Sequence, residues 1–266
     1  MATASASRSQ TFAQAPLFAI LGAIMLLLYL AWYLSVRSLS KVSKADASLQ
    51  ALTIAFPNLA GVGLPIAQAV LGPTGTVPVA VALAAGSILV SPLTLILVEL
   101  SSSKQGEAVD TPAVRMLKAV RRALTKPVVV APALGILLSL SDLKLDAVTE
   151  ACLMLIGHAA AGVALFLTGL ILSAEPFQLD RKVVAAIGVA GIIRPLLTAA
   201  VVLILPVSAD TAKTAVLLGA VPSGFFGILF AVNYRLDSAT AGSMVTASTG
   251  FSIVTMAIAI AVLFPK

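Results

Sequence analysis

Charged residues are scarce in this sequence. Only 11% of its 266 residues are Asp, Glu, Lys or Arg, whereas a soluble domain has about 25%. Hydrophobic residues make up 59% of the chain, and its mean hydropathy is +1.07. This composition excludes an ordinary soluble domain and predicts an all-α polytopic membrane protein.

The sequence also has few cysteines and few acidic side chains within its apolar segments. The single cysteine, Cys152, excludes an internal disulfide. No Asp or Glu occupies the middle of an apolar segment. The net charge of +6 would suit a nucleic-acid partner. However, the basic residues lie in short connections between apolar segments, where they signal membrane topology instead.

The chain contains eight apolar segments of roughly the length needed to cross a bilayer. A polar tail, residues 1–15, precedes them. The first apolar run, Pro16–Val36, has 21 residues, which is too long for the core of a signal peptide. The predicted spans are 16–36, 48–71, 77–99, 127–141, 147–173, 183–206, 211–232 and 239–264.

Basic residues alternate between the two sets of connections. One set carries 12 of the 17 basic residues, the other carries 4, and Arg194 lies inside a span. The positive-inside rule places the basic-rich set in the cytoplasm and both termini outside. The basic-rich set comprises Arg37, Lys41, Lys44, Lys104, Arg115, Lys118, Arg121, Arg122, Lys126, Arg181, Lys182 and Arg235.

The one long connection, residues 100–126, is polar and then strongly basic. Residues 112–124 are predicted to form a short amphipathic helix with Val114, Leu117, Val120 and Ala123 on one side. The simpler interpretation is a cytoplasmic linker lying against anionic headgroups, and the alternative is a regulatory lipid switch.

Two proline pairs interrupt apolar segments at matching places. The first three predicted spans form one triplet, and the last three form another. Pro57-Asn58 lies in the second span of the first triplet, and Pro222-Ser223 lies in the second span of the last triplet. The separation is 42 residues both from Pro57 to Glu99 and from Pro222 to Phe264. The number of spans between the triplets gives them opposite orientations, so the pattern predicts an inverted repeat with two crossed broken helices.

Such a crossing has a definite chemistry. Each half-helix after a proline begins with unpaired N–H groups and a positive dipole end, which favour an anion. Asn58 and Ser223 stand at cap-like positions, and Gly224 leaves backbone accessible. The carbonyls freed near Thr53 and Leu218 are candidates to accept from a ligand or hold a cation. The alternative is that Pro57 and Pro222 only kink packed helices.

Arg194 lies near the middle of the predicted span 183–206. A cation at that depth costs about 2.5–3.5 kcal/mol and needs a partner. Since no carboxylate occupies the middle of a span, a substrate carboxylate is the expected partner. Arg194→Ala is then expected to lose anion binding while the protein stays in the membrane. The alternative partners are backbone carbonyls freed at Pro195 or at the broken helices.

Few residues are available for ion coupling. His158 is the only titratable candidate of the kind that proton-driven carriers use, and Asn58, Thr246, Thr249, Ser248 and Ser252 offer neutral oxygens for sodium. For His158 and the hydroxyl residues the alternative is ordinary helix packing.

The segments LTIAFPNLAGVGLPIAQAVLG (52–72), GVALFLTGLIL (162–172), RPLL (194–197) and AVPSGFFGILFAVNY (220–234), together with KPVVVAPALGILLSL (126–140) and ASTGFSIVT (247–255), resemble the auxin efflux carrier family. The bacterial branch with malonate transporters is the most similar. The resemblance implies a bile acid–sodium symporter-like fold with two five-span inverted repeats, a substrate such as malonate, and a bacterial inner-membrane location. It also implies crossover residues Pro57, Asn58, Pro222 and Ser223.

The same resemblance implies a domain division. Residues 16–99 and 183–264 correspond to a transport domain, 127–173 to scaffold helices, and 100–126 to a cytoplasmic loop. Sodium or a proton is the implied coupling ion, and a homodimer is the implied assembly.

The chain departs from the family in its number of spans. The family has ten spans and this sequence has eight, so two spans before residue 16 are expected to be missing from the scaffold. Two rival functions follow from the residues. One is an intramembrane serine hydrolase using Ser223 and His158, although the Gly-x-Ser-x-Gly turn is absent. The other is a receptor or truncated protein that does not transport.

Overall fold

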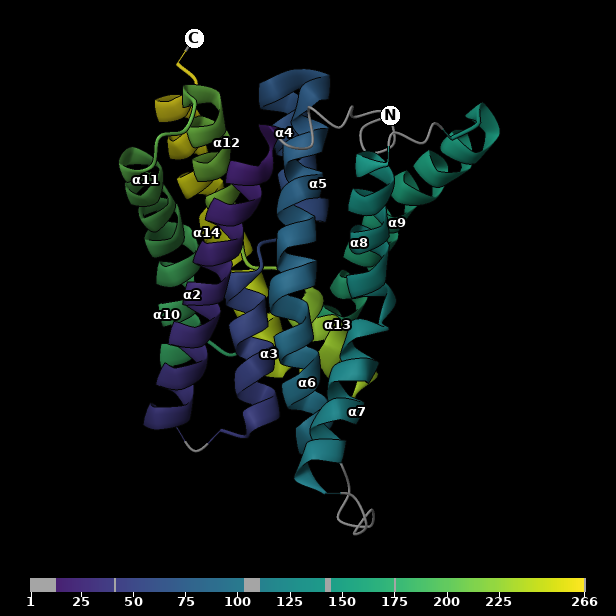
Figure 1. Ribbon diagram of the computed structural model, residues 1–266. Helices are drawn as coiled ribbons and strands as arrows, with labels where there is room; N and C mark the ends of the chain where they lie inside the picture. The colour runs from purple at the N-terminus through teal and green to yellow at the C-terminus, as the bar shows by residue number, and fades with distance from the viewer. Residues whose placement is uncertain (1–12, 41, 103–110, 142–144, 175, 266) are drawn as a thin grey trace.

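The computed structural model describes residues 13–40, 42–102, 111–141, 145–174 and 176–265. Within these ranges the chain is helical apart from short turns, and the only extended pairing is one isolated bridge between Pro57 and Ser223 (Figure 1). The predicted all-α class is confirmed.

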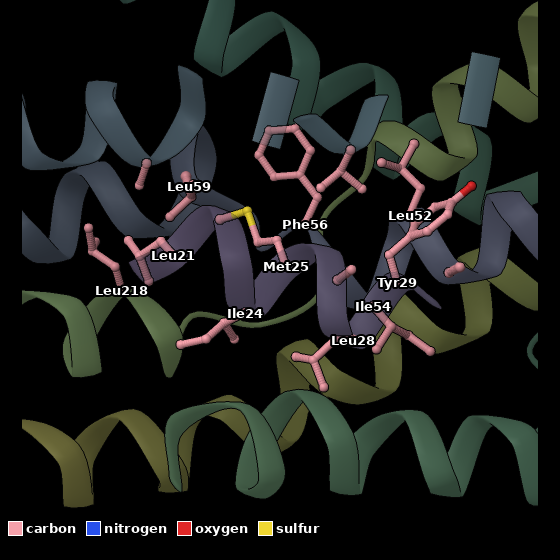
Figure 2. Close-up of a cluster of buried hydrophobic side chains, with 14 of the residues drawn as sticks. Leu21, Ile24, Met25, Leu28, Tyr29, Leu52, Ile54, Phe56, Leu59 and Leu218 are labelled. Atoms are coloured by element: carbon pink, nitrogen blue, oxygen red, sulfur yellow. The ribbon is translucent and has the colours of Figure 1, made fainter. Parts of the chain in front are cut away.

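Helix α2 (Ala15–Leu39) lies at the centre of the hydrophobic core. Pro16 stands in its first turn, where the missing N–H costs no hydrogen bond. Its buried side packs against helices from both ends of the sequence. Figure 2 shows Ile24, Met25 and Leu28 of α2 among side chains of the two broken segments, including Phe56 and Leu218.

The first broken segment begins with α3 (Lys44–Ala55). The Ser43 hydroxyl caps this helix by accepting from the Asp46 N–H at 3.0 Å. After the break, the chain continues as the π-helix η1 (Leu59–Gly63) and then α4 (Leu64–Leu71). A 3-10 turn, η2 (Gly72–Gly75), then leads into the next helix.

That next helix runs without interruption from Thr76 to Ser101. It comprises α5 (Thr76–Ala85), the π-turn η3 (Gly86–Val90) and α6 (Ser91–Ser102). Over its most apolar stretch 61% of the residues are buried, so it belongs to the interior of the bundle.

Three helices form the middle of the chain. The predicted amphipathic helix is present as α7 (Pro112–Leu124), with the expected bounds. The axis then bends by 60° into α8 (Pro127–Leu140). Helix α9 (Ala147–Ala174) follows, and only 6% of its most apolar stretch is buried.

The last third of the chain repeats the order of the first. One helix comprises α10 (Arg181–Gly188), the π-turn η4 (Val189–Ile193) and α11 (Arg194–Ile204). A broken pair follows, α12 (Ala209–Gly219) and α13 (Phe226–Asn233), and then α14 (Ala239–Leu263). In Figure 1, α2 descends while α10 and α11 ascend, so the two groups run in opposite directions.

Among the described residues, five helices are long and apolar enough to span a bilayer, or six if α7 and α8 count as one bent span. The chain is therefore a multi-pass membrane protein. The two broken segments, predicted as spans 48–71 and 211–232, consist of shorter helices that do not pass this test singly. The count of eight spans and the inverted repeat remain predictions.

The basic-rich elements gather at one end of the bundle. The end of α2, the start of α3, helix α7 and the start of α10 all lie toward the lower end in Figure 1. This arrangement agrees with the alternation of charge along the sequence.

Candidate functional site

The two helix breaks lie against each other. Pro57 and Ser223 form an antiparallel bridge, and the Asn58 N–H donates to the Pro222 carbonyl at 2.9 Å. In the other direction, the Gly224 N–H donates to the Thr53 carbonyl at 2.9 Å. The predicted crossing of two broken helices is therefore present, and we call residues 53–58 and 219–225 the crossover.

Pro57 and Pro222 explain why both helices stop here. Each lacks an N–H and leaves a carbonyl without a helical partner, at Thr53 and at Leu218. The Thr53 carbonyl accepts from Gly224, and the Leu218 carbonyl accepts from the Val221 N–H at 3.4 Å. The carbonyls that the sequence offered to a ligand or cation are thus used within the crossover, as a backbone surrounded by lipid requires.

Asn58 caps the first half-helix, as predicted. Its Oδ1 accepts from the Gly61 N–H at 3.1 Å. Its own carbonyl accepts from both Val62 and Gly63 at 3.0 Å, the double acceptance that opens the π-turn. Asn58 is only 5% exposed.

Ser223 does not cap the second half-helix, which corrects the sequence prediction. Helix α13 begins three residues later, and its cap position is Phe225, which has no side-chain hydrogen bond. The Ser223 N–H donates to the Ser248 Oγ at 3.2 Å. The Ser223 hydroxyl is completely buried and has no hydrogen-bond partner among the described residues. Four other buried polar atoms also lack a partner among the described residues, at Trp32, Gln50, Ser87 and Ser91. Ser223 is distinguished from them by its place at the crossover.

Two glycines allow the breaks to approach this closely. A Cβ at Gly224 would collide with the Phe56 carbonyl. A Cβ at Gly227 would collide with the Thr53 Oγ1 and would lie 2.7 Å from the Leu49 carbonyl. The backbone of the second break therefore lies directly on the end of α3.

Arg194 binds the backbone of both breaks. Its Nε donates to the Gly219 carbonyl at 2.8 Å, and one terminal nitrogen donates to the Ile54 carbonyl at 2.6 Å. The other terminal nitrogen donates to the Val221 carbonyl. The side chain is 1% exposed. The structure thus gives Arg194 the alternative partners foreseen from the sequence, the carbonyls at the broken helices.

The local sequence places Arg194 in this position. Pro195 cannot donate to the carbonyl four residues earlier, and the Arg194 N–H instead bonds to the Val189 carbonyl, which closes the π-turn η4. Thr198 packs against Gly219, where a Cβ would lie 2.7 Å from the Thr198 Oγ1. Because Gly219 has no side chain, α11 comes close enough for the guanidinium to reach across the crossover.

All three hydrogen-bond partners of Arg194 are neutral carbonyls, and no carboxylate in the described part of the chain forms an ion pair with it. Guanidinium stays protonated in proteins, so the crossover has a buried positive charge beside it. In a medium of low dielectric this charge acts over several ångströms.

The predicted ion-coupling residues are dispersed. Ser248 is buried and contacts Ser223, whereas Thr246 and Thr249 lie on the exposed side of α14. The Thr246 hydroxyl donates to the Gly242 carbonyl at 3.1 Å, which is ordinary helix packing. The side chain of His158 lies outside the described part of the structure. The described residues contain no cluster of three His, Cys, Asp or Glu side chains suited to a metal.

Sequence reasoning missed a second polar cluster, at the basic end of the bundle. The Tyr234 hydroxyl donates to Glu99 Oε1 at 2.8 Å, and Arg122 forms an ion pair with Glu99 Oε2 at 3.2 Å. Burial, together with the bond to Glu99, raises the pKa of Tyr234, so the phenol keeps its proton. No spacing in the sequence brings these three positions together.

Apolar helices arranged around two hydrogen-bonded helix breaks define a multi-pass membrane transporter. The chain belongs to the family described as membrane transport protein, which matches residues 2–260. This confirms the resemblance to the auxin efflux carrier family.

Curated relatives point to the same class. The chain is 28% identical over 217 residues to the uncharacterized transporter YfdV of Escherichia coli K12, covering 80% of this chain and 67% of the relative. The match to YfdV of Shigella flexneri has the same identity and coverage.

Proposed function

We propose that this protein is a secondary transporter that moves a small organic anion, such as malonate, across the bacterial inner membrane by alternating access. The observation that carries the proposal is the buried hydroxyl of Ser223, which has no partner among the described residues. It lies at a crossover beside the charge of Arg194, whose hydrogen-bond partners are all neutral carbonyls. A carboxylate accepts hydrogen bonds, and this hydroxyl is a donor without an acceptor.

In this proposal the residues at the crossover have different roles in binding the substrate. Ser223 donates to the bound carboxylate, and Asn58, Pro57, Pro222 and Gly224 shape the backbone around it. Arg194 contributes its charge and holds the breaks together without touching the substrate. This division differs from the direct contact between Arg194 and a substrate carboxylate that the sequence predicted, because the carbonyls of Ile54, Gly219 and Val221 already bind the guanidinium.

The charge of the proposed substrate determines in which direction transport is downhill and when a coupled ion is needed. With a negative interior, exit of an anion is downhill by about 2.3 kcal/mol per charge per 100 mV. Import requires an exchanged anion or a coupled cation, and sodium or a proton is proposed for that role. Among the hydroxyl residues, Ser248 is the proposed cation ligand, because its Oγ already accepts a hydrogen bond from the Ser223 N–H at the crossover.

The test is flux into proteoliposomes. Uptake and efflux of labelled mono- and dicarboxylates are measured with sodium and pH gradients imposed separately. The proposal expects saturable dicarboxylate flux that depends on membrane potential. Saturable binding without flux would support the receptor alternative. The hydrolase alternative has little support, because Ser223 has no hydrogen-bonded base among the described residues.

A further inference from the structure

Helix α7 carries an unusual combination of exposed side chains. It contains four basic residues and no acidic one. Four of its large apolar side chains are substantially exposed: Val114 at 39%, Met116 at 46%, Leu117 at 69% and Leu124 at 50%. Such a surface is unfavourable in water and suits a helix lying in the headgroup region of a bilayer.

The buried side of α7 is small and faces the bundle. Ala119 and Ala123 are buried, and Ala123 packs in a cluster with Leu95 of α6 and Val129 of α8. Val114, Leu117 and Leu124 follow helical spacing on the opposite face, where Arg121 also lies. The alanines thus fix α7 to the bundle, while these three apolar side chains and Arg121 point away from it.

The occupant of this face follows from its charge and its place in the fold. Helix α7 connects α6 with α8 toward the lower end of the bundle, the end where the basic residues gather (Figure 1). A basic end of this kind is expected beside the anionic headgroups of the cytoplasmic leaflet. Arg115, Lys118 and Arg121 are exposed beside the apolar side chains. Anionic phospholipid supplies both the acyl chains and the negative headgroups that these side chains fit.

The inner side of α7 is linked to the broken helix α13. Arg122 of α7 pairs with Glu99 of α6 at 3.2 Å, and Glu99 accepts from Tyr234 at 2.8 Å. Tyr234 is the residue that ends α13. Lys126, just after α7, also lies over the Tyr234 ring, 5.3 Å from its centroid. A change in the position of α7 therefore acts on α13 through Glu99 and Tyr234.

We propose that α7 is an anionic-lipid-binding helix whose docking on the bilayer restrains the broken helix α13 through Arg122, Glu99 and Tyr234. The proposal is independent of the transported substrate. It gives α7 a regulatory role, because alternating access requires the broken helices to move.

The lipid contact is tested with the full chain carrying Cys152→Ser and Leu117→Cys, spin-labelled at residue 117. The protein is reconstituted in phosphatidylcholine alone or with about 30% phosphatidylglycerol. The label is expected to become more accessible to oxygen, and less accessible to a water-soluble nickel reagent, when phosphatidylglycerol is present. Replacing Arg115, Lys118 and Arg121 by Gln should lower the docked-to-undocked ratio by about fivefold per charge.

Arg181→Gln with Lys182→Gln, at the start of α10, is the matched control and should leave the label at 117 unchanged. The link to α13 is read from a second label at Val232→Cys, a position 48% exposed. Its mobility should fall with phosphatidylglycerol, and Tyr234→Phe should abolish that response while docking at 117 persists. A water-accessible label at 117 in both lipids, or a lipid response at 232 that survives Tyr234→Phe, would overturn the proposal.

Discussion

Each helix break of the crossover contains a proline, Pro57 in the first and Pro222 in the second, but the two breaks have different surroundings. At the first break, Asn58 caps the following helix with its own side chain, and the helix resumes at Leu59. At the second break, the chain stays irregular until Phe226, and the Ser223 hydroxyl has no partner within the described part of the chain. The difference is that the helix after the first break is capped by a side chain of that break, whereas the second break retains a serine hydroxyl with no partner among the described residues.

This contrast assigns the two breaks different roles. The first serves as a fixed support, and its carbonyls at Thr53 and Ile54 receive bonds from Gly224 and Arg194. The second lies on that support with its serine hydroxyl unsatisfied. Substitutions at the two breaks test this asymmetry, and the first of them removes the hydrogen bonds from Arg194 that reach both breaks.

Arg194→Met is expected to have the largest effect. It leaves three buried carbonyls without the guanidinium donor, and each buried acceptor left unsatisfied costs about 1–3 kcal/mol. Little folded protein should survive extraction, as measured by size-exclusion chromatography and thermal unfolding in detergent. This replaces the expectation that loss of the arginine affects only anion binding.

Arg194→Lys separates the charge from the geometry. Lysine keeps the positive charge but cannot bond three carbonyls with a planar fork. We expect an intermediate melting temperature and a retained preference for anions. If Arg194→Met unfolds at the same temperature as the native protein, the three carbonyl bonds do not hold the crossover.

Gly227→Ala is expected to have the next largest effect. The new Cβ collides with Thr53 on the supporting helix, and overpacking of this kind costs about 1–3 kcal/mol. The matched control is Gly63→Ala in the first half-helix, where the nearest atom is 3.4 Å away. Thermal unfolding should show a clear loss for Gly227→Ala and little change for Gly63→Ala. Equal losses would contradict the close approach of the second break to α3.

Asn58→Ala and Ser223→Ala should change stability differently. Loss of the Asn58 cap should destabilise by about 1 kcal/mol. Loss of the Ser223 hydroxyl removes a buried group that makes no bond, so its effect on stability should be near zero or slightly favourable. Thermal unfolding of both variants side by side gives the answer, and a Ser223→Ala variant less stable than Asn58→Ala would show that the hydroxyl is satisfied.

Much of the crossover could be predicted because its signals are local. A proline in an apolar run removes a helical donor from the sequence alone, and Asn58 directly after Pro57 stands in a cap position. Proline by itself does not decide the outcome, because Pro132 lies inside the unbroken helix α8. The bounds of helix α7 were equally predictable from its spacing of apolar residues. Its predicted apolar side was wrong in one member, because Ala123 is buried against the bundle while Val114 and Leu117 are exposed on the opposite face. These features depend on near neighbours in the chain.

The parts that could not be predicted depend on distant contacts. Ser223 resembles a cap in sequence, but the bonds of residues 223 and 224 to Ser248 and Thr53 hold the chain extended past the cap position. The choice of Arg194 between a ligand and three carbonyls depends on how closely α11 approaches Gly219, which no local pattern encodes. The Glu99–Tyr234 bond likewise joins residues 135 positions apart.

The most direct test of the central claim compares dicarboxylate uptake by the native protein and by Ser223→Ala in proteoliposomes. A hydrogen bond to a charged group contributes about 1.5–3 kcal/mol, so KM should rise by at least about tenfold while the melting temperature stays unchanged. An unchanged KM for a properly folded Ser223→Ala protein would contradict the assignment of the second break as the anion site.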